Sequence, residues 1–171
     1  MMRKSRILPI FLAFWLWPST SHALEGDWEL GGDVAAFLMP HRDLYGGGGE
    51  FIARYSVLDG LSVGAGFGIY GARQTTSREN LALFQLNLGV HYALDVLEWI
   101  PGVGVQFSSL FDDSGTFHRD GHGLAVDFEA FVQYRGFRQI GIAIFFRYAL
   151  VFVDDDFMTV GLRFSWFSGL F

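Results

Sequence analysis

An alternating segment near the end of the chain leaves few folds open. Over residues 158–166, large apolar residues alternate strictly with Thr159, Gly161, Arg163 and Ser165. This period of two is typical of a β-strand that has one apolar and one polar face. The apolar face needs a cover, which is either a second layer of the protein or lipid. In lipid, a sheet has to close on itself, because no edge can be left unpaired.

The same alternation recurs in seven earlier segments, so we predict an all-β, eight-stranded antiparallel up-and-down barrel. Each segment has one apolar face, and we expect that face to point outward. After the N-terminal segment, no run of 18 apolar residues predicts a transmembrane helix. The seven earlier strands are predicted at residues 28–38, 48–57, 61–70, 80–92, 99–110, 123–134 and 138–149.

The connections are predicted to alternate between long polar loops and short turns, as in outer-membrane barrels. The long loops are residues 40–47, 72–79, 111–122 and 150–157. Within the fifth strand, Pro101 cannot donate a hydrogen bond to a neighbouring strand. We therefore predict a bulge or a late strand start at that position.

Composition supports this fold and excludes some functions. The 171 residues include 22 Gly and 19 Phe, which fits short strands, tight turns and aromatic belts. The formal net charge of −6 argues against a nucleic-acid-binding protein, which needs a basic surface. The chain has no Cys, so it can form neither a disulfide nor a thiolate metal site.

Residues 1–23 are predicted to be a secretory signal peptide. Arg3, Lys4 and Arg6 precede an apolar stretch at residues 7–17, and small residues around Ala23 suit cleavage by a signal peptidase. The stretch is too short to span a membrane. The barrel domain would then comprise residues 24–171.

The last strand also resembles the closing-strand signal of bacterial outer-membrane barrels. That signal combines a polar residue, a glycine and two aromatic residues near a terminal aromatic residue. The matching residues are Thr159, Gly161, Phe164, Trp166 and Phe171. Together with the eight-strand pattern, the chain resembles the small OmpA/OmpX-type barrels of Gram-negative bacteria.

This resemblance implies a location in the bacterial outer membrane, with both termini in the periplasm and the long loops outside the cell. It also implies contact with outer-membrane lipid and lipopolysaccharide, and with the barrel-assembly machinery during insertion. We expect a monomer that has no cofactor and binds no nucleic acid.

Charged residues at inward positions are the first candidate site. An eight-stranded barrel is only wide enough to be filled by side chains, so these charges have to pair. A first hairpin centred between Asp43 and Leu44 would place Asp33 opposite Arg54. We therefore predict a central lumen cluster of Asp33, Arg54, Glu129 and Arg163. A second layer above it would contain Asp127 and Arg147. The alternative use of these charges is a catalytic or gated ion path.

Other motifs have simpler interpretations. The glycines of residues 66–71 match a dinucleotide-binding pattern, but no helix follows them, so we interpret them as making room for Tyr70. His91 is predicted to be buried and hydrogen-bonded rather than a catalytic base. Acidic and histidine residues in the loops could bind a metal, although we expect them to be solvated and no metal to be bound. They are Asp112, Asp113, His118, Asp120, His122 and the run of residues 154–156.

We expect a structural or surface-interaction role, with no catalytic residue and a lumen plugged by charged side chains. One alternative is a lipid-modifying enzyme similar to lipid A deacylases, which place a Ser, a His and an acid on the lipid-facing side. Ser109 is the exceptional outward polar residue, and the predicted strands put no outward His beside it. A narrow pore is the other alternative. A soluble sandwich would leave an apolar face on all eight strands exposed to water.

Overall fold

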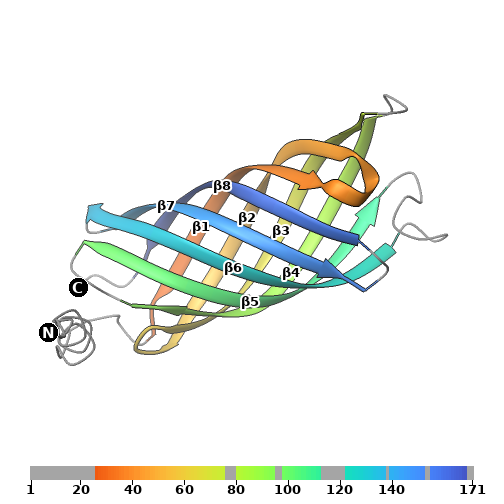
Figure 1. Ribbon diagram of the computed structural model, residues 1–171. Helices are drawn as coiled ribbons and strands as arrows, with labels where there is room; N and C mark the ends of the chain where they lie inside the picture. The colour runs from red at the N-terminus through yellow and green to blue at the C-terminus, as the bar shows by residue number, and fades with distance from the viewer. Residues whose placement is uncertain are drawn as a thin grey trace, which may run out of the picture.

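Eight antiparallel strands form a closed barrel in the computed structural model of this chain (Figure 1). Each strand pairs with its neighbours in sequence, and the last strand pairs with the first. The structure describes residues 26–75, 80–94, 98–112, 122–137, 139–152 and 155–168. The strands are β1 (Trp28–Met39), β2 (Leu44–Leu58), β3 (Leu61–Gln74), β4 (Asn80–Ala93), β5 (Trp99–Asp112), β6 (His122–Phe137), β7 (Ile140–Val151) and β8 (Asp155–Phe167).

The predicted alternation of faces is confirmed in all eight strands. In β1, for example, the outward Val34 is 67% exposed, whereas the inward Asp33 is 3% exposed. The outward faces consist mainly of large apolar side chains. Outward polar residues lie near the strand ends, as Arg73, Asn80 and Asp156 do. Among the described residues, no helix is both long and apolar enough to span a membrane.

The two ends of the barrel differ. At the end that we call the turn end, β1 begins and short connections join β2 to β3, β4 to β5 and β6 to β7. Outward Trp and Tyr side chains gather there, and two pairs of them are in contact. Trp28 and Tyr55 have ring centroids 5.2 Å apart, and Trp99 and Tyr134 have centroids 4.9 Å apart. We call the opposite end the loop end.

The first hairpin is tighter than predicted. Residues 40–47 were expected to form a loop, but a single turn of 3₁₀ helix, η1 (Pro40–Arg42), is followed by Asp43 in the left-handed conformation (φ 50°). β2 therefore begins at Leu44. This shorter turn moves the register, so that Asp33 pairs with Glu50 rather than with Arg54, and Arg54 pairs with Glu29. The prediction that Asp33 faces Arg54 was wrong.

The other long loops are also shorter than predicted, because the ladders continue beyond the apolar positions. β3 extends to Gln74, β5 extends to Asp112, and β6 begins at His122. Likewise β7 ends at Val151 and β8 begins at Asp155, within the predicted loop of residues 150–157. Backbone pairing satisfies the polar main chain there, so polar side chains at strand ends do not interrupt the strands.

Pro101 lies in β5 without a bulge, contrary to our prediction. It pairs with Val132 of β6, and its carbonyl oxygen accepts a 2.8 Å hydrogen bond from the amide of Leu94. The paired residues of β4 and β5 end at Ala93 and Gly102. The missing N–H of Pro101 therefore faces the position just beyond that ladder, where the strand needs no donor.

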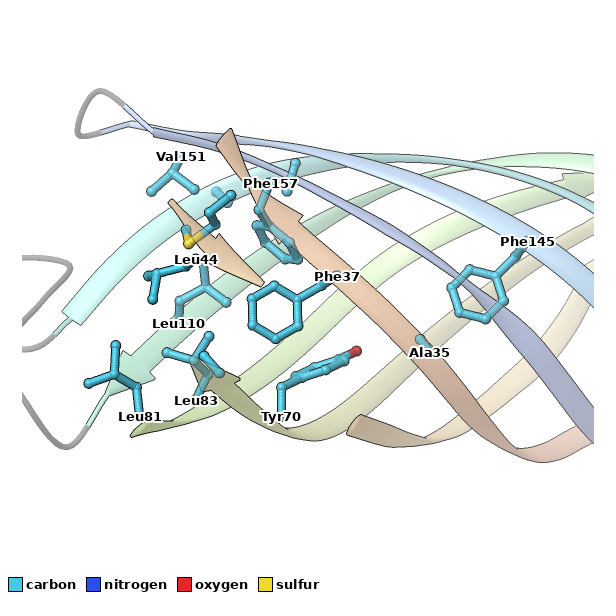
Figure 2. Packing of buried hydrophobic residues seen from close by; sticks show 14 of the residues in the cluster. Ala35, Phe37, Leu44, Tyr70, Leu81, Leu83, Leu110, Phe145, Val151 and Phe157 are labelled. Carbon is cyan, nitrogen blue, oxygen red and sulfur yellow. The ribbon is translucent and has the colours of Figure 1, made fainter. Parts of the chain in front are cut away.

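A cluster of buried apolar side chains fills the barrel interior toward the loop end. Figure 2 shows Phe37, Leu83, Leu110 and Phe157 pointing toward one another from different strands. The inward side chains at the tip of the first hairpin complete the cluster, because Met39 and Leu44 are each only 1% exposed. We did not predict this apolar cluster from the sequence.

Glycines in β2 allow the first hairpin to bend over the loop end. A Cβ atom at Gly46 would lie 2.0 Å from the carbonyl oxygen of Gly71, and one at Gly48 would lie 2.1 Å from that of Ile69. No side chain fits between two backbones that are this close. Figure 1 shows the orange ribbon of this hairpin curving at the loop end, where the amide of Thr75 donates a 3.0 Å hydrogen bond to the carbonyl oxygen of Asp43.

Candidate functional site in the barrel interior

Glu129 is the centre of a buried ion-pair network. Its Oε1 accepts hydrogen bonds of 2.8 Å from Arg54 Nη2 and from Arg163 Nη1. Its Oε2 accepts 2.9 Å bonds from Arg147 Nη2 and Arg163 Nη2, and a 3.3 Å bond from Gln106 Nε2. Three arginines from β2, β7 and β8 thus converge on one carboxylate of β6. All of these side chains are buried.

Asp33 joins this network across the β1–β8 seam. Arg163 is its paired residue in the ladder, and the guanidinium donates two 2.9 Å hydrogen bonds, from Nε to Oδ1 and from Nη2 to Oδ2. Such two-point contact is the strongest form of an Arg–carboxylate pair. The structure therefore brings Asp33, Arg54, Glu129 and Arg163 into one cluster, although Arg54 reaches it through Glu129 and not through Asp33.

This arrangement predicts which double-mutant cycle shows coupling. Asp33→Ala and Arg163→Ala should be non-additive by about 1–3 kcal/mol in the free energy of unfolding, because they remove the same direct contact. Asp33→Ala and Arg54→Ala should be closer to additive. Urea unfolding in detergent micelles measures both cycles, and a larger coupling for the Asp33–Arg54 cycle would contradict the observed register.

Arg147 belongs to the central cluster rather than to a second layer. In addition to Glu129, its Nη1 donates a 2.7 Å hydrogen bond to Glu50 Oε2. Glu50 also accepts bonds from Asn87 Nδ2 (2.5 Å) and from the hydroxyl of Tyr70 (3.4 Å). The sequence indicated that Glu50 points inward, but we did not predict it as a member of the network. The register error that placed Arg54 opposite Asp33 hid the role of Glu50.

Asp127 lies outside the arginine network, contrary to the prediction that it forms a layer with Arg147. Its Oδ2 accepts hydrogen bonds from the hydroxyl of Ser108 and, at 3.1 Å, from Gln85 Nε2. The Ser108 hydroxyl also lies 2.7 Å from Asn87 Oδ1. Neutral donors thus hold this carboxylate, and no described Arg donates a hydrogen bond to it in the structure.

Inward glycines provide the space that the lumen side chains occupy. A Cβ atom at Gly66 would lie 2.2 Å from Glu50 Oε1, and one at Gly64 would lie 2.5 Å from Arg54 Cγ. A Cβ atom at Gly104 would lie 2.4 Å from the ring of His91. The glycine pattern in β3 therefore has a packing cause. It makes room for Glu50 and Arg54, in addition to Tyr70.

One cavity lies toward the turn end, and a smaller one lies beside the network itself. The larger, of about 70 Å³, opens at the turn end and is lined by polar and aromatic side chains that include Glu29, Arg54, Gln133 and Arg135. Asp27 lies at its edge, where partial burial raises the pKa of the carboxyl group although Arg135 opposes this effect. The smaller cavity, of about 10 Å³, lies deeper, beside His91, Gln106 and Glu50.

Half of the eight candidate metal ligands lie outside the described residues. These are Asp113, His118, Asp120 and Asp154. Asp112 and Asp156 belong to strands, and Asp156 Oδ2 accepts a 2.5 Å hydrogen bond from the Tyr148 hydroxyl. Within the described ranges, no three His, Asp or Glu side chains are grouped in a way that could hold a metal ion.

The residues of the closing-strand signal lie at the seam between β8 and β1. Phe164 and Trp166 point outward, whereas Thr159 is buried inside the barrel. A Cβ atom at Gly161 would lie 2.5 Å from the carbonyl oxygen of Val34 in β1, so this glycine permits close approach of the two strands. Phe171 lies outside the described residues. The use of these residues as an assembly signal stays a prediction.

The register also changes one point about the pairing of β5 and β6. β6 begins at His122, which we had placed in a loop, and His122 pairs with Phe111 of β5. Ser109 pairs with Leu124. Ser109 and His122 are therefore diagonal neighbours on adjacent strands, a relation that the predicted loop of residues 111–122 had concealed.

The closed barrel and its buried polar network define a class. Eight antiparallel strands, an outward apolar face and a buried polar network are the fold of the small outer-membrane β-barrels. No family model matches this chain, and no curated protein matches it in sequence.

Solved structures agree with this class. Neisserial surface protein A superimposes with a TM-score of 0.62 at 13% identity, covering 82% of this chain and 95% of that one. Ail, the attachment invasion locus protein of Yersinia pestis, gives 0.53 at 14% identity and covers 85% and 100%. The outer membrane enzyme PagL gives 0.51 at 7% identity and covers 80% and 97%. At these identities the likeness concerns the fold alone.

Proposed function

We propose that this protein resides in a bacterial outer membrane as a plugged barrel, with a structural or surface-interaction role. The loop end would face the outside of the cell, and both termini would lie in the periplasm. The buried charged and apolar side chains of the interior support this proposal. A channel needs a continuous polar path, whereas here charged and apolar side chains occupy successive levels of the interior.

Two different kinds of packing would close the lumen. At the central level, Glu129 and three arginines bridge the barrel from wall to wall. Closer to the loop end, the apolar cluster around Phe37 and Leu110 fills the interior, and the tip of the first hairpin covers it. An ion crossing this barrel would have to break the ion pairs and then pass the apolar cluster, which is costly.

The outward face supports the membrane location. Large apolar side chains cover it from β1 to β8, and exposure of such a surface to water would be far beyond that of a soluble monomer. The Trp and Tyr side chains at the turn end would lie at one membrane interface, where amphipathic rings are favoured. We propose that outer-membrane lipid and lipopolysaccharide are its neighbours, that the barrel-assembly machinery inserts it, and that it is a monomer.

Two measurements test the role together. Purified protein in planar lipid bilayers should give no stable conductance steps, because both levels of the lumen are filled. Lipid A should have the same mass in cells that express the unsubstituted protein and in cells that express a Ser109→Ala variant. Discrete conductance steps would show that the protein is a pore and not a plugged barrel. Loss of an acyl chain from lipid A that depends on Ser109 would show that it is an enzyme.

The enzymatic alternative has one observation in its favour. The β5–β6 register brings Ser109 and His122 to diagonal positions on neighbouring strands, and a Ser–His pair is the core of many acyl hydrolases. A nucleophile of this kind also needs a base held in place by a third group. Because no such group is established among the described residues, we favour the non-enzymatic role.

A further inference from the structure

The side chain of His91 lies in the barrel without a hydrogen-bond partner. It is 4% exposed, and neither Nδ1 nor Nε2 has a partner among the described residues. Its Nε2 is 3.8 Å from Glu129 Oε1, which is too long for a hydrogen bond. A buried imidazole that bonds to nothing costs about 1–3 kcal/mol, so a polar partner is expected beside it.

The small cavity beside His91 has the size and lining for such a partner. Its volume of about 10 Å³ is close to that of one water-sized probe. Glu50, Gln106 and Arg54 line it together with His91, and these side chains offer both donors and acceptors. Buried waters occupy sites that provide two to four such groups. A molecule larger than water would not fit.

Arg54 separates this cavity from the larger one at the turn end. Among the described residues, Arg54 is the one that lines both cavities. Its guanidinium is held by Glu129 at 2.8 Å, while Glu29, which lines the turn-end cavity, lies 3.6 Å from its Nη1. Arg54 is therefore a shared wall of the two cavities.

We propose that the cavity beside His91 is a binding site for water, and that it belongs to a hydrated chamber that opens at the turn end. Arg54 forms the inner wall of the turn-end cavity, and the apolar cluster closes the chamber toward the loop end. The lumen is then wet on one side and dry on the other. This inference concerns hydration of the interior, and it holds whether the protein has a structural role or is an enzyme acting at its outward face.

The chain has no Cys, so a single introduced thiol reports access without background. His91→Cys should react slowly with methyl methanethiosulfonate in detergent micelles, as followed by mass spectrometry. Arg54→Ala should accelerate that reaction about tenfold or more, because loss of a charged hydrogen bond removes the barrier. The matched control, Leu110→Cys in the apolar cluster, should stay unreactive with either residue at position 54.

A third substitution identifies the route. Ser62 lines the turn-end cavity opposite Ser56 of β2, so Ser62→Phe should fill this space. In the His91→Cys, Arg54→Ala background it should return the labelling rate to the slow value. A labelling rate at residue 91 that neither Arg54→Ala nor Ser62→Phe changes would overturn the proposal. An equal acceleration of labelling at residue 110 would also overturn it.

The unsubstituted protein provides a test that does not depend on the folding of any variant. With ¹⁵N-labelled histidine, the imidazole N–H of His91 should show an exchange cross-peak with water in NMR spectra of the micelle-bound barrel. An imidazole N–H that remains protected from exchange for hours would show that no water reaches the site, and would also overturn the proposal.

Discussion

Replacing Glu129 by Gln should destabilise the barrel more than any other single isosteric change in the lumen. The substitution keeps the shape of the side chain but removes the charge shared by Arg54, Arg147 and Arg163, and it turns an amide donor toward their donors. Breaking a buried ion pair on one side costs about 3–5 kcal/mol, and here three guanidinium groups lose the same partner.

Asp127→Asn is the matched control for this prediction. Asp127 is as deeply buried as Glu129, but its partners are the neutral donors of Ser108 and Gln85. An amide oxygen can accept the same hydrogen bonds, so the expected loss is about 1 kcal/mol or less. Urea unfolding in lipid vesicles measures both variants. Equal losses for the two substitutions would mean that burial of a carboxylate, and not the arginine network, determines stability.

Replacing Gly48 by Ala should prevent assembly of the barrel. The added Cβ would lie 2.1 Å from the carbonyl oxygen of Ile69 and 2.6 Å from the Cα of Tyr70, so backbone rather than a mobile side chain would have to move. The β2–β3 ladder would separate where the first hairpin bends. The unheated protein should then migrate on a gel like its heated form, because a compact barrel no longer resists denaturation.

Gly71→Ala is the matched control. It tests whether the loss of assembly depends on the position of the glycine or follows from any Gly→Ala change in this ladder. Gly71 is adjacent to Tyr70 and pairs with Gly47, but its Cβ would meet its nearest neighbour, the carbonyl oxygen of Gly47, at 3.9 Å. That is an ordinary contact distance, so this variant should assemble with the heat-dependent migration of the unsubstituted barrel. Normal assembly of Gly48→Ala would show that the bend at the loop end tolerates a side chain.

Which residues of each strand point inward and which point outward could be predicted from the sequence, because the barrel wall separates two different environments. The outward face accepts apolar side chains such as Val34 but has no place for a charge such as Arg163, so a period of two is sufficient to assign each side. The number of strands and their closed, antiparallel order follow from the same constraint.

Register and strand length could not be predicted in the same way. Register depends on the geometry of a turn, and a left-handed Asp43 after a 3₁₀ turn shortened the first hairpin in a manner that residue types alone do not specify. The convergence of Arg54, Arg147 and Arg163 on Glu129 further depends on which side chains reach across the lumen. We chose opposite charges on paired strands as neighbours, and this choice concealed Glu50.

The apolar cluster had a signal in the sequence that we did not use. Leu81 and Leu83 are an even number of residues from the inward Gln85, so they lie on the same face of the strand. Phe157 has the same relation to Arg163. Leu81 and Leu83 lie within the predicted strand of residues 80–92, so its alternation already places them inside the barrel. Phe157 was assigned to the loop of residues 150–157, and an earlier start of the last strand would have placed it inside as well.

The contact between Asp33 and Arg163 joins residues from the first and the last strand. During folding, seven strands can pair in chain order before this contact exists, and until then the incomplete sheet holds Asp33 without the guanidinium that binds it in the closed barrel. The unbalanced negative charge disfavours insertion of an incomplete sheet into lipid, since a lone carboxylate is costly there. Arrival of Arg163 removes that penalty in one step, so the ion pair couples charge neutralisation to completion of the barrel and makes closure the late, committing event of assembly.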